Sequence, residues 1–254
     1  MLSSTKLVLE SWKADLNRKR APEGFVLMTV YGPLRLGKST YAFKTGVQTL
    51  MQLYGLEEDG RGGAWDELKR YIIFHPEHFF QKRKEMDEKG LERIPFLIWD
   101  DAGLWLYALD WYDPFINAFL KELNVIGTRI GALILTTPSP KFILRKLRDF
   151  PDSINVRIID DGVENDIWRR IAKSYKQWFL PDGKSRVRLE FEDVFSALMP
   201  DTFFKWYKPQ RDAYEKLALK LVQEKWEQLK SKSRVLASVS DIPEFKLPSL
   251  RSLN

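Results

Sequence analysis

The chain has 254 residues, of which 44% are hydrophobic and 30% charged, a balance typical of a globular protein that excludes disorder of the whole chain. This length suffices for one α/β domain with an appendage but is short for two full domains. The absence of cysteine excludes disulfides, thiolate metal sites and cysteine nucleophiles, and the net charge of +6 favours a polyanionic partner without identifying it.

Composition and hydropathy also bear on where the chain works. The longest apolar runs, such as residues 102–109, are far shorter than the ~20 residues that a membrane span needs, and the N-terminus lacks the apolar core of a signal peptide. Few histidines, no cysteine and abundant Lys and Glu suit an intracellular protein from a hot environment. We therefore expect a cytoplasmic protein without a membrane span.

The chain begins with a predicted amphipathic helix and a predicted buried strand. In residues 3–19 apolar side chains recur at helical spacing after a run of possible capping residues. Residues 25–31 form an apolar, β-branched run of the kind found in buried parallel strands. A glycine-bounded loop follows, and residues 38–54 have the length and spacing of a helix that packs on a sheet.

Strands and helices then alternate along the chain. Short aromatic and β-branched runs predict the strands, and amphipathic or charged stretches between them predict the helices. Such alternation is typical of a three-layer α/β fold, with a mainly parallel sheet between helices. The predicted strands are 71–74, 96–100, 132–137 and 155–159, and the predicted helices are 78–89, 114–127 and a basic one near 141–149.

The pattern changes after residue 166. Residues 167–180 alternate as strands do, a Pro-Asp-Gly-Lys turn follows, and alternation resumes to residue 191, which predicts a β-hairpin. A long helix is predicted from about Gln210 to Lys230, before a Ser-rich tail. The expected organisation is an N-terminal helix (1–22), a core (23–162), the hairpin with the C-terminal helix (163–230) and a flexible tail (231–254).

A phosphate-binding loop is predicted between the first strand and the helix after it. The pattern G-x-x-x-x-G-K-[ST] is met there, and this position makes a fortuitous glycine turn the weaker alternative. Backbone N–H groups would hold the β-phosphate of ATP, Lys38 would reach the β- and γ-phosphates, and the Ser39 hydroxyl would ligate Mg²⁺. The predicted nucleotide-binding residues are Gly32, Pro33, Leu34, Arg35, Leu36, Gly37, Lys38, Ser39 and Thr40.

Two acidic residues end the predicted strand at 96–100. Asp100 and Asp101 follow the loop by about sixty residues, the spacing of a Walker B element. We expect Asp100 to bind Mg²⁺ through water and Asp101 to polarise the attacking water, where many ATPases carry Glu. Because Asp is one methylene shorter than Glu, either the site is tighter or hydrolysis is slow until a partner subunit closes it.

Further catalytic roles are predicted downstream. Thr136 ends a strand where an ATPase of this kind carries a polar sensor near the γ-phosphate, although a helix cap before Pro138 explains it equally well. In the basic segment that follows, Arg145 or Arg148 could act as an arginine finger on the ATP of a neighbouring subunit, which makes a homo-oligomer the expected assembly. A solvated basic face is the alternative.

Cations and aromatic residues are interleaved in the predicted hairpin. Cations that neutralise phosphates beside rings that stack on bases suit single-strand binding, so we predict a DNA-contacting hairpin. The same alternation could instead place a basic, solvated face opposite an aromatic, packed one. The candidate DNA-binding residues are Arg169, Arg170, Lys173, Lys176, Arg186 and Arg188.

The order of these elements, with a strand between the two nucleotide motifs, is similar to the additional-strand division of P-loop NTPases. Residues 31–33, 37–40 and 99–103 resemble the DnaA-like ATPases of spindle-shaped viruses and plasmids of hot-acid archaea. The resemblance covers about residues 25–160. It implies an AAA+-like subunit that uses ATP and Mg²⁺, acts on single- or double-stranded DNA in replication or its control, and works inside the host cell.

Other functions remain open at this point. No small helical lid is evident after residue 160, and residues 136–139 with 156–158 are also similar to FtsK/HerA-type DNA translocases and viral packaging ATPases. A small-molecule kinase, with residues 141–148 as its lid, shares the same loop. An inactive nucleotide-dependent scaffold would accommodate Asp101 in place of Glu.

Overall fold

A computed structural model describes residues 1–16, 24–109, 113–151, 153–179 and 185–232. The chain divides into two units, and the first, Met1–Tyr207, contains the whole sheet. The second unit begins at Lys208 and contains the remainder of the last helix as far as it is described. The strands are β1 (Val26–Tyr31), β2 (Ile72–Ile73), β3 (Leu97–Trp99), β4 (Ala132–Thr137), β5 (Ile154–Glu164), β6 (Ile167–Phe179) and β7 (Ser185–Ser196).

These strands form one seven-stranded sheet in the order β2-β3-β4-β1-β5-β6-β7. The pairs from β2 through β5 are all parallel, whereas β6 and β7 are added as antiparallel strands. Because parallel strands end at the same edge of a sheet, the carboxyl ends of β1, β4 and β3 lie next to one another. The residues that follow β1 and β3 in sequence therefore meet at that edge.

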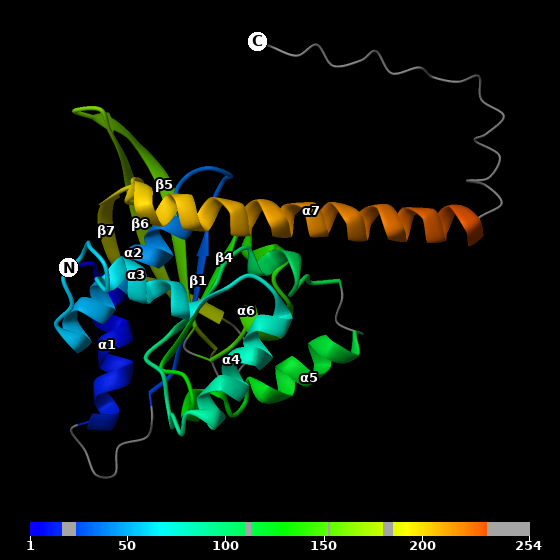
Figure 1. The fold of residues 1–254 in the computed structure, drawn as a ribbon, viewed down its shortest axis with the longest axis horizontal. Coiled ribbons are helices and arrows are strands. Elements are labelled where there is room, and N and C mark those ends of the chain that lie inside the picture. Colours follow the sequence, from blue (N-terminus) through cyan, green and yellow to red (C-terminus); the bar gives the residue numbers. More distant parts are fainter. Residues whose placement is uncertain (17–23, 110–112, 152, 180–184, 233–254) are drawn as a thin grey trace. The chain divides into compact units, whose positions relative to one another are not determined.

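Helices cover both faces of the parallel part of the sheet (Figure 1). One side carries α1 (Ser3–Leu16), α2 (Lys38–Tyr54) and α3 (Ala64–Leu68), and the other carries α4 (Pro76–Glu88), α5 (Pro114–Glu122) and α6 (Arg145–Arg148). The final helix, α7, runs from Asp201 to Lys232. The predicted three-layer α/β fold with an N-terminal helix, a hairpin and a long C-terminal helix is confirmed.

The core on the α4 and α5 side of the sheet is strongly aromatic. Trp99 of β3 is fully buried, and it packs against Phe79 of α4 and Phe119 of α5, with ring centroids 6.3 and 5.5 Å away. Truncating an aromatic side chain in such a cluster to Ala typically costs about 3–5 kcal/mol. This packing fixes the position of the β3 strand end, on which the acidic motif lies.

A buried carboxylate on β7 ties the added strands to the N-terminal helix. Asp193 accepts hydrogen bonds from the backbone N–H of Ser3 at 2.8 Å and from the Tyr41 hydroxyl at 2.7 Å. Burial, followed by the charge of Asp193, raises the pKa of Tyr41 well above its ordinary value, so the hydroxyl remains a donor. The contact joins α1, α2 and β7 in one unit.

The last helix begins earlier than predicted. It starts at Asp201 rather than near Gln210, and Pro209 lies inside it. A proline that lacks an N–H usually marks the first turn of a helix, which explains the sequence-based boundary. Phe203 and Tyr207 are nevertheless buried on the N-terminal side of Pro209, and their packing accounts for the extra turns.

Other boundaries also differ from the predictions. The basic segment near 141–149 is not one helix but a 3₁₀ turn at Pro140–Phe142 followed by the single-turn α6, because Ile143 and Leu144, at ψ 141° and 136°, interrupt the helical backbone. Strand β5 extends to Glu164 and forms a second hairpin with β6. Asn165 and Asp166, at φ 50° and 61°, supply the left-handed turn between them.

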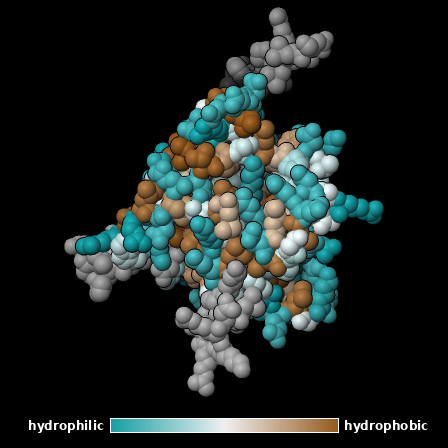
Figure 2. Space-filling view, turned by 90° about the vertical axis from the view of Figure 1, so that its left-hand side faces the viewer, coloured by the Kyte–Doolittle hydropathy of each residue, from teal (hydrophilic) through white to brown (hydrophobic). Residues whose placement is uncertain are grey.

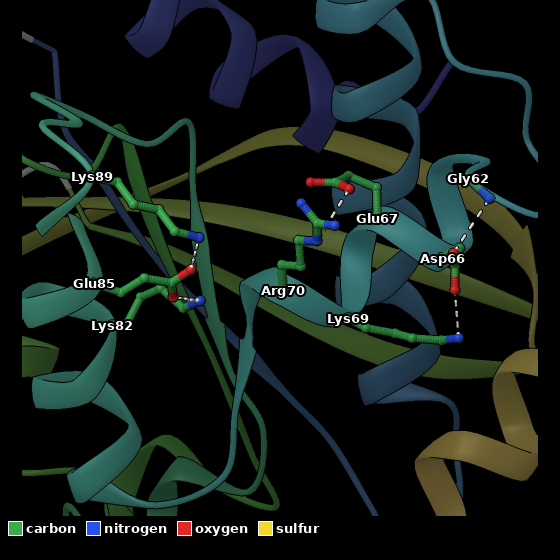
Figure 3. Close-up of polar contacts among 8 residues, drawn as sticks. All are labelled: Gly62, Asp66, Glu67, Lys69, Arg70, Lys82, Glu85 and Lys89. Atoms are coloured by element: carbon green, nitrogen blue, oxygen red, sulfur yellow. Dashed lines mark hydrogen bonds and ion pairs between the residues drawn. The ribbon is translucent and has the colours of Figure 1, made fainter.

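The surface carries mixed polar and apolar groups. Figure 2 shows hydrophobic residues in separate groups among hydrophilic ones on one face of the molecule. Near α3 and on α4, short-range ion pairs are arranged as in Figure 3, where hydrogen bonds from Lys82 and Lys89 lower the pKa of Glu85 to about 2. Such exposed pairs contribute only about 0–1 kcal/mol each.

Among the described helices, none combines the length and apolarity that crossing a bilayer requires.

Candidate functional site

The loop between β1 and α2 has the backbone of a phosphate-binding loop. Gly32 has φ 150°, and a Cβ added there would lie 2.8 Å from the carbonyl oxygen of Ile158 on β5. Gly37 caps α2 in the left-handed region, at φ 85°, where a side chain is disfavoured. These two positions therefore require glycine for local reasons, and the loop between them, including Pro33, Leu34 and Arg35, is exposed.

Lys38 opens α2 and is largely buried, at 7% exposure. Its Nζ donates a hydrogen bond to the carbonyl oxygen of Pro33 at 2.8 Å, so the ammonium group lies over the loop it belongs to. The first hydrogen bond of the helix runs from the Tyr41 N–H to the Gly37 carbonyl at 2.9 Å. An ammonium group and a helix N-terminus at one loop form an anion-binding arrangement.

Asp100 connects the loop to the end of β3. Its Oδ1 accepts hydrogen bonds from the hydroxyls of Ser39 and Thr136, each at 2.7 Å. Its Oδ2 accepts a hydrogen bond from the hydroxyl of Tyr207, also at 2.7 Å. The side chain is 1% exposed, and three O–H donors solvate the carboxylate in place of water. The structure thus brings together the residues predicted for the metal site.

Thr136 is hydrogen-bonded to both acidic residues. Its Oγ1 donates to Asp100 and accepts from the backbone N–H of Asp101 at 2.8 Å. In this arrangement the only proton of the hydroxyl is used on Asp100, so Thr136 positions that carboxylate. Asp101 itself is half-buried and lies in the left-handed region, at φ 51°, which Asp tolerates better than most residues.

Tyr207 is a site residue that the sequence analysis missed. Its ring packs against Phe43 and Phe74, with centroids 5.2 and 6.1 Å away, while its hydroxyl reaches Asp100 across 107 residues of sequence. The only available signal was the aromatic spacing before Pro209, which indicates packing but names no polar partner.

Replacing Tyr207 by Phe should destabilise the first unit. The change leaves one oxygen of a buried carboxylate without its donor, and hydrogen bonds to charged groups contribute about 1.5–3 kcal/mol. We expect the free energy of unfolding in urea to fall by about that amount. Tyr107→Phe, which removes a hydroxyl from a side chain that is 36% exposed, is the matched control and should change it little. Equal stability of both variants and the wild type would contradict the inferred contact.

The two candidate arginine fingers lie in different surroundings. The side chain of Arg145 is 84% exposed and its Nε pairs with the Asp149 carboxylate at 3.0 Å. Arg148 is half-buried, and its Nε is enclosed without a hydrogen-bond acceptor among the residues that the structure describes. A finger must reach a neighbouring subunit, so the exposed Arg145 suits that role better than Arg148.

Most of the candidate DNA-binding cations already have carboxylate partners. Arg169 pairs with Glu164 and Asp161, and Lys173 pairs with Glu192 at 2.8 Å. Arg170 is only 3% exposed and pairs with Asp160, while Arg188 pairs with Glu190 on its own strand. Cross-strand register places Lys176 opposite Arg188 and Trp178 opposite Arg186, and Arg186 is exposed. The hairpin is therefore largely charge-compensated.

The end of β7 borders the first turns of α2. The Lys44 ammonium donates to the carbonyl oxygen of Ser196 at 2.8 Å, and the Thr40 hydroxyl donates to that of Ala197 at 3.4 Å. Burial lowers the pKa of Lys44. Residues 196–197 thus lie beside the phosphate-binding loop, a contact that the sequence patterns did not predict.

Three features together define the P-loop NTPase fold. The first strand of a parallel sheet leads through a glycine loop into a helix, and an Asp at the end of β3 is hydrogen-bonded to that helix. The predicted class is confirmed. The sequence is 28% identical over 205 residues to the uncharacterized protein B-251 of Sulfolobus spindle-shape virus 1, over 79% of each chain. No protein-family model matches the sequence.

Two solved structures from archaea and their viruses have a similar fold. The KaiC-like protein PH0186 from Pyrococcus horikoshii OT3 is 16% identical, with a TM-score of 0.34 over 66% of this chain and 89% of that one. The genome packaging NTPase B204 from Sulfolobus turreted icosahedral virus 2, in complex with ATP-gammaS, is 13% identical, with a TM-score of 0.37 over 65% of this chain and 96% of that one.

Proposed function

We propose that this protein is a Mg²⁺-dependent ATPase. The observation that carries the proposal is the 2.7 Å contact between the Ser39 hydroxyl and Asp100 Oδ1, which joins the loop after β1 to the end of β3. A hydroxyl and a carboxylate oxygen at this spacing fit Mg²⁺, which takes oxygen ligands and is held in proteins by one or two carboxylates together with substrate phosphates. When bound, the ion would neutralise charge on the phosphates.

Separate residues of the chain bind the phosphates, position Asp100 and activate the attacking water. The loop N–H groups and Lys38 hold the β- and γ-phosphates, and Asp100 is kept in place by Thr136 and Tyr207. Asp101 orients and deprotonates the attacking water as general base. Asp101 is half-buried in the left-handed region, whereas Asp100 is buried against three hydroxyl donors, which supports a separate role for the two acids.

The strand order supports assignment to the additional-strand division. In the sheet β4 lies between β1, which leads into the loop, and β3, which ends in the acids. Beyond β5 the chain adds antiparallel β6 and β7 to the same sheet instead of leaving it. That continuation favours the translocase or packaging alternative over a DnaA-like subunit in replication initiation, because the latter resemblance implies a helical lid after the core.

We further infer that the ATPase acts on DNA as a homo-oligomer inside the host cell. The relative from Sulfolobus spindle-shape virus 1 supports a setting in a mobile element. Arg145, with its highly exposed side chain, is suited to contact ATP bound to a neighbouring copy. The pair with Asp149 is a surface ion pair, which is weak enough to be exchanged for a phosphate contact.

ATP turnover by the full-length protein tests the DNA part of this proposal. We expect turnover in the presence of Mg²⁺ to rise several-fold when DNA is added, because work on DNA requires hydrolysis to be coupled to contact with the strand. Single- and double-stranded DNA are assayed separately. Phosphate transfer from ATP to a metabolite would instead identify a kinase, and turnover that neither form of DNA changes would contradict the motor.

A further inference from the structure

A pocket of about 440 Å³ opens beside α6, where the sheet continues past β1 into the three long strands. Its volume falls within the range of about 300–1,000 Å³ that is typical of ligand sites. Neither Lys38, Ser39 nor Asp100 lines it, so it is separate from the proposed nucleotide site. The pocket is lined by Pro140, by Arg148 of α6 with the following Asp149, and by residues of β1, β5, β6 and β7.

The floor of the pocket is one face of the sheet. Tyr31 of β1 lies in register with Arg157 of β5, and Asn155 of β5 with Tyr175 of β6, so each pair points to the same side. Gln177, two residues beyond Tyr175, shares that face. The floor therefore presents two phenol rings and two carboxamides, and the tyrosines and carboxamides are half-buried.

Two guanidinium groups, those of Arg157 on β5 and Arg148 on α6, add positive charge to the pocket. Arg157 is exposed, and among the described residues neither it nor Arg148 forms an ion pair. The buried Nε of Arg148 has no acceptor in the described part of the chain, while the carboxylate of Asp149 beside it is engaged by Arg145. Burial raises the pKa of Tyr31 and Arg157 opposes that rise, so the ring and the charge are within electrostatic reach of each other.

The contrast with the hairpin cations is informative. Arg169, Arg170, Lys173 and Arg188 have carboxylate partners, whereas the two guanidinium groups of the pocket lack them within the described chain. A cation without a protein partner is available to a phosphate, and an aromatic ring beside it is available to a base. Carboxamides recognise the hydrogen-bonding edges of bases.

We propose that this pocket binds one nucleotide of single-stranded DNA. The phosphate contacts the two guanidinium groups, the base stacks on a tyrosine ring, and its edge meets a carboxamide. The inference rests on the proposed function in one respect, namely that the polymer bound is DNA. Because Tyr31 directly precedes Gly32, an occupied pocket lies next to the first residue of the phosphate loop, which provides a route from DNA contact to hydrolysis.

Fluorescence anisotropy with a labelled single strand of about 16 nucleotides tests the pocket. With the full-length protein and no ATP, Arg157→Gln should weaken binding about tenfold at low salt and reduce the slope of log K against log salt by about 0.7, the contribution of one phosphate contact. Tyr175→Leu should weaken binding at least about fivefold and leave the slope unchanged, since stacking releases no counterions.

The matched control is Arg70→Gln, which removes an equal charge from an exposed arginine that pairs with Glu67 and does not line the pocket, and it should bind within about twofold of the wild type. Equal binding by the wild type, Arg157→Gln and Tyr175→Leu would overturn the pocket while leaving action on DNA intact. Complete displacement of the strand by excess AMP would also overturn it, because the site would then take free nucleotides. A wild-type protein that binds no strand would instead contradict the proposed function.

Discussion

Replacing Lys38 by Ala should lower kcat for ATP hydrolysis at least about 100-fold. A loss of this size is usual when one preorganised charge is removed from a site that stabilises developing negative charge. The ammonium group is buried against its own loop and donates to Pro33 at 2.8 Å, so it is already placed where the phosphates would lie. Phosphate release measured under saturating Mg²⁺ and ATP gives the result directly.

Lys44→Ala is the matched control for that variant. Lys44 lies nearly two turns further along the same helix and carries the same charge, but it donates to the Ser196 carbonyl rather than to the loop. We expect Lys44→Ala to retain turnover within about threefold, because long-range effects of one cation are screened in salt. Equal losses in both variants would mean that the charge of α2 in general, and not the position of Lys38, supports hydrolysis.

Replacing Asp100 by Asn produces the second large effect. One carboxylate oxygen becomes an amide nitrogen, which cannot accept a hydroxyl proton, so at least one of the hydrogen bonds that Ser39, Thr136 and Tyr207 now donate is lost. The negative charge that would attract Mg²⁺ is lost as well. We expect turnover to fall at least about 100-fold and the Mg²⁺ concentration for half-maximal activity to rise about tenfold, measured by titrating Mg²⁺ at fixed ATP.

Asp101→Asn separates the roles of the two acids in the same titration. Asn occupies the left-handed region as readily as Asp, so the backbone at φ 51° is preserved. Loss of a general base typically costs about 10²–10⁴-fold in rate, and the Mg²⁺ dependence should stay unchanged. If Asp101→Asn shifts the Mg²⁺ requirement and Asp100→Asn does not, the assignments of the two residues must be exchanged.

Local patterns predicted the parts of the fold that local chemistry determines. The bounds of α2 and β4 agree with the predicted ranges 38–54 and 132–137, because a capping glycine and a continuous β-branched run mark them. The hairpin of β6 and β7 followed from alternation around a turn sequence. Loop and acids could be placed together because strand ends of a parallel sheet share one edge.

Tertiary contacts explain what the sequence did not reveal. The hydroxyl of Tyr207 meets Asp100 only because aromatic packing holds the first turns of α7 against α2, and no spacing rule connects residues so far apart. The compensation of Arg169 and Arg170 depends on acids of β5, whose extension past residue 159 was not predicted. The pocket beside α6 arises from side chains of β1, β5, β6 and β7 together with Pro140, Arg148 and Asp149.

Isothermal calorimetry of the full-length protein with ATP in the presence of Mg²⁺ tests the central claim most directly. We expect a saturable heat of association with one site per chain, lost in Lys38→Ala and weakened in Asp100→Asn when Mg²⁺ is limiting. If folded wild-type protein releases or absorbs no heat at millimolar ATP and Mg²⁺, the proposed binding of the nucleotide between the glycine loop and Asp100 is contradicted.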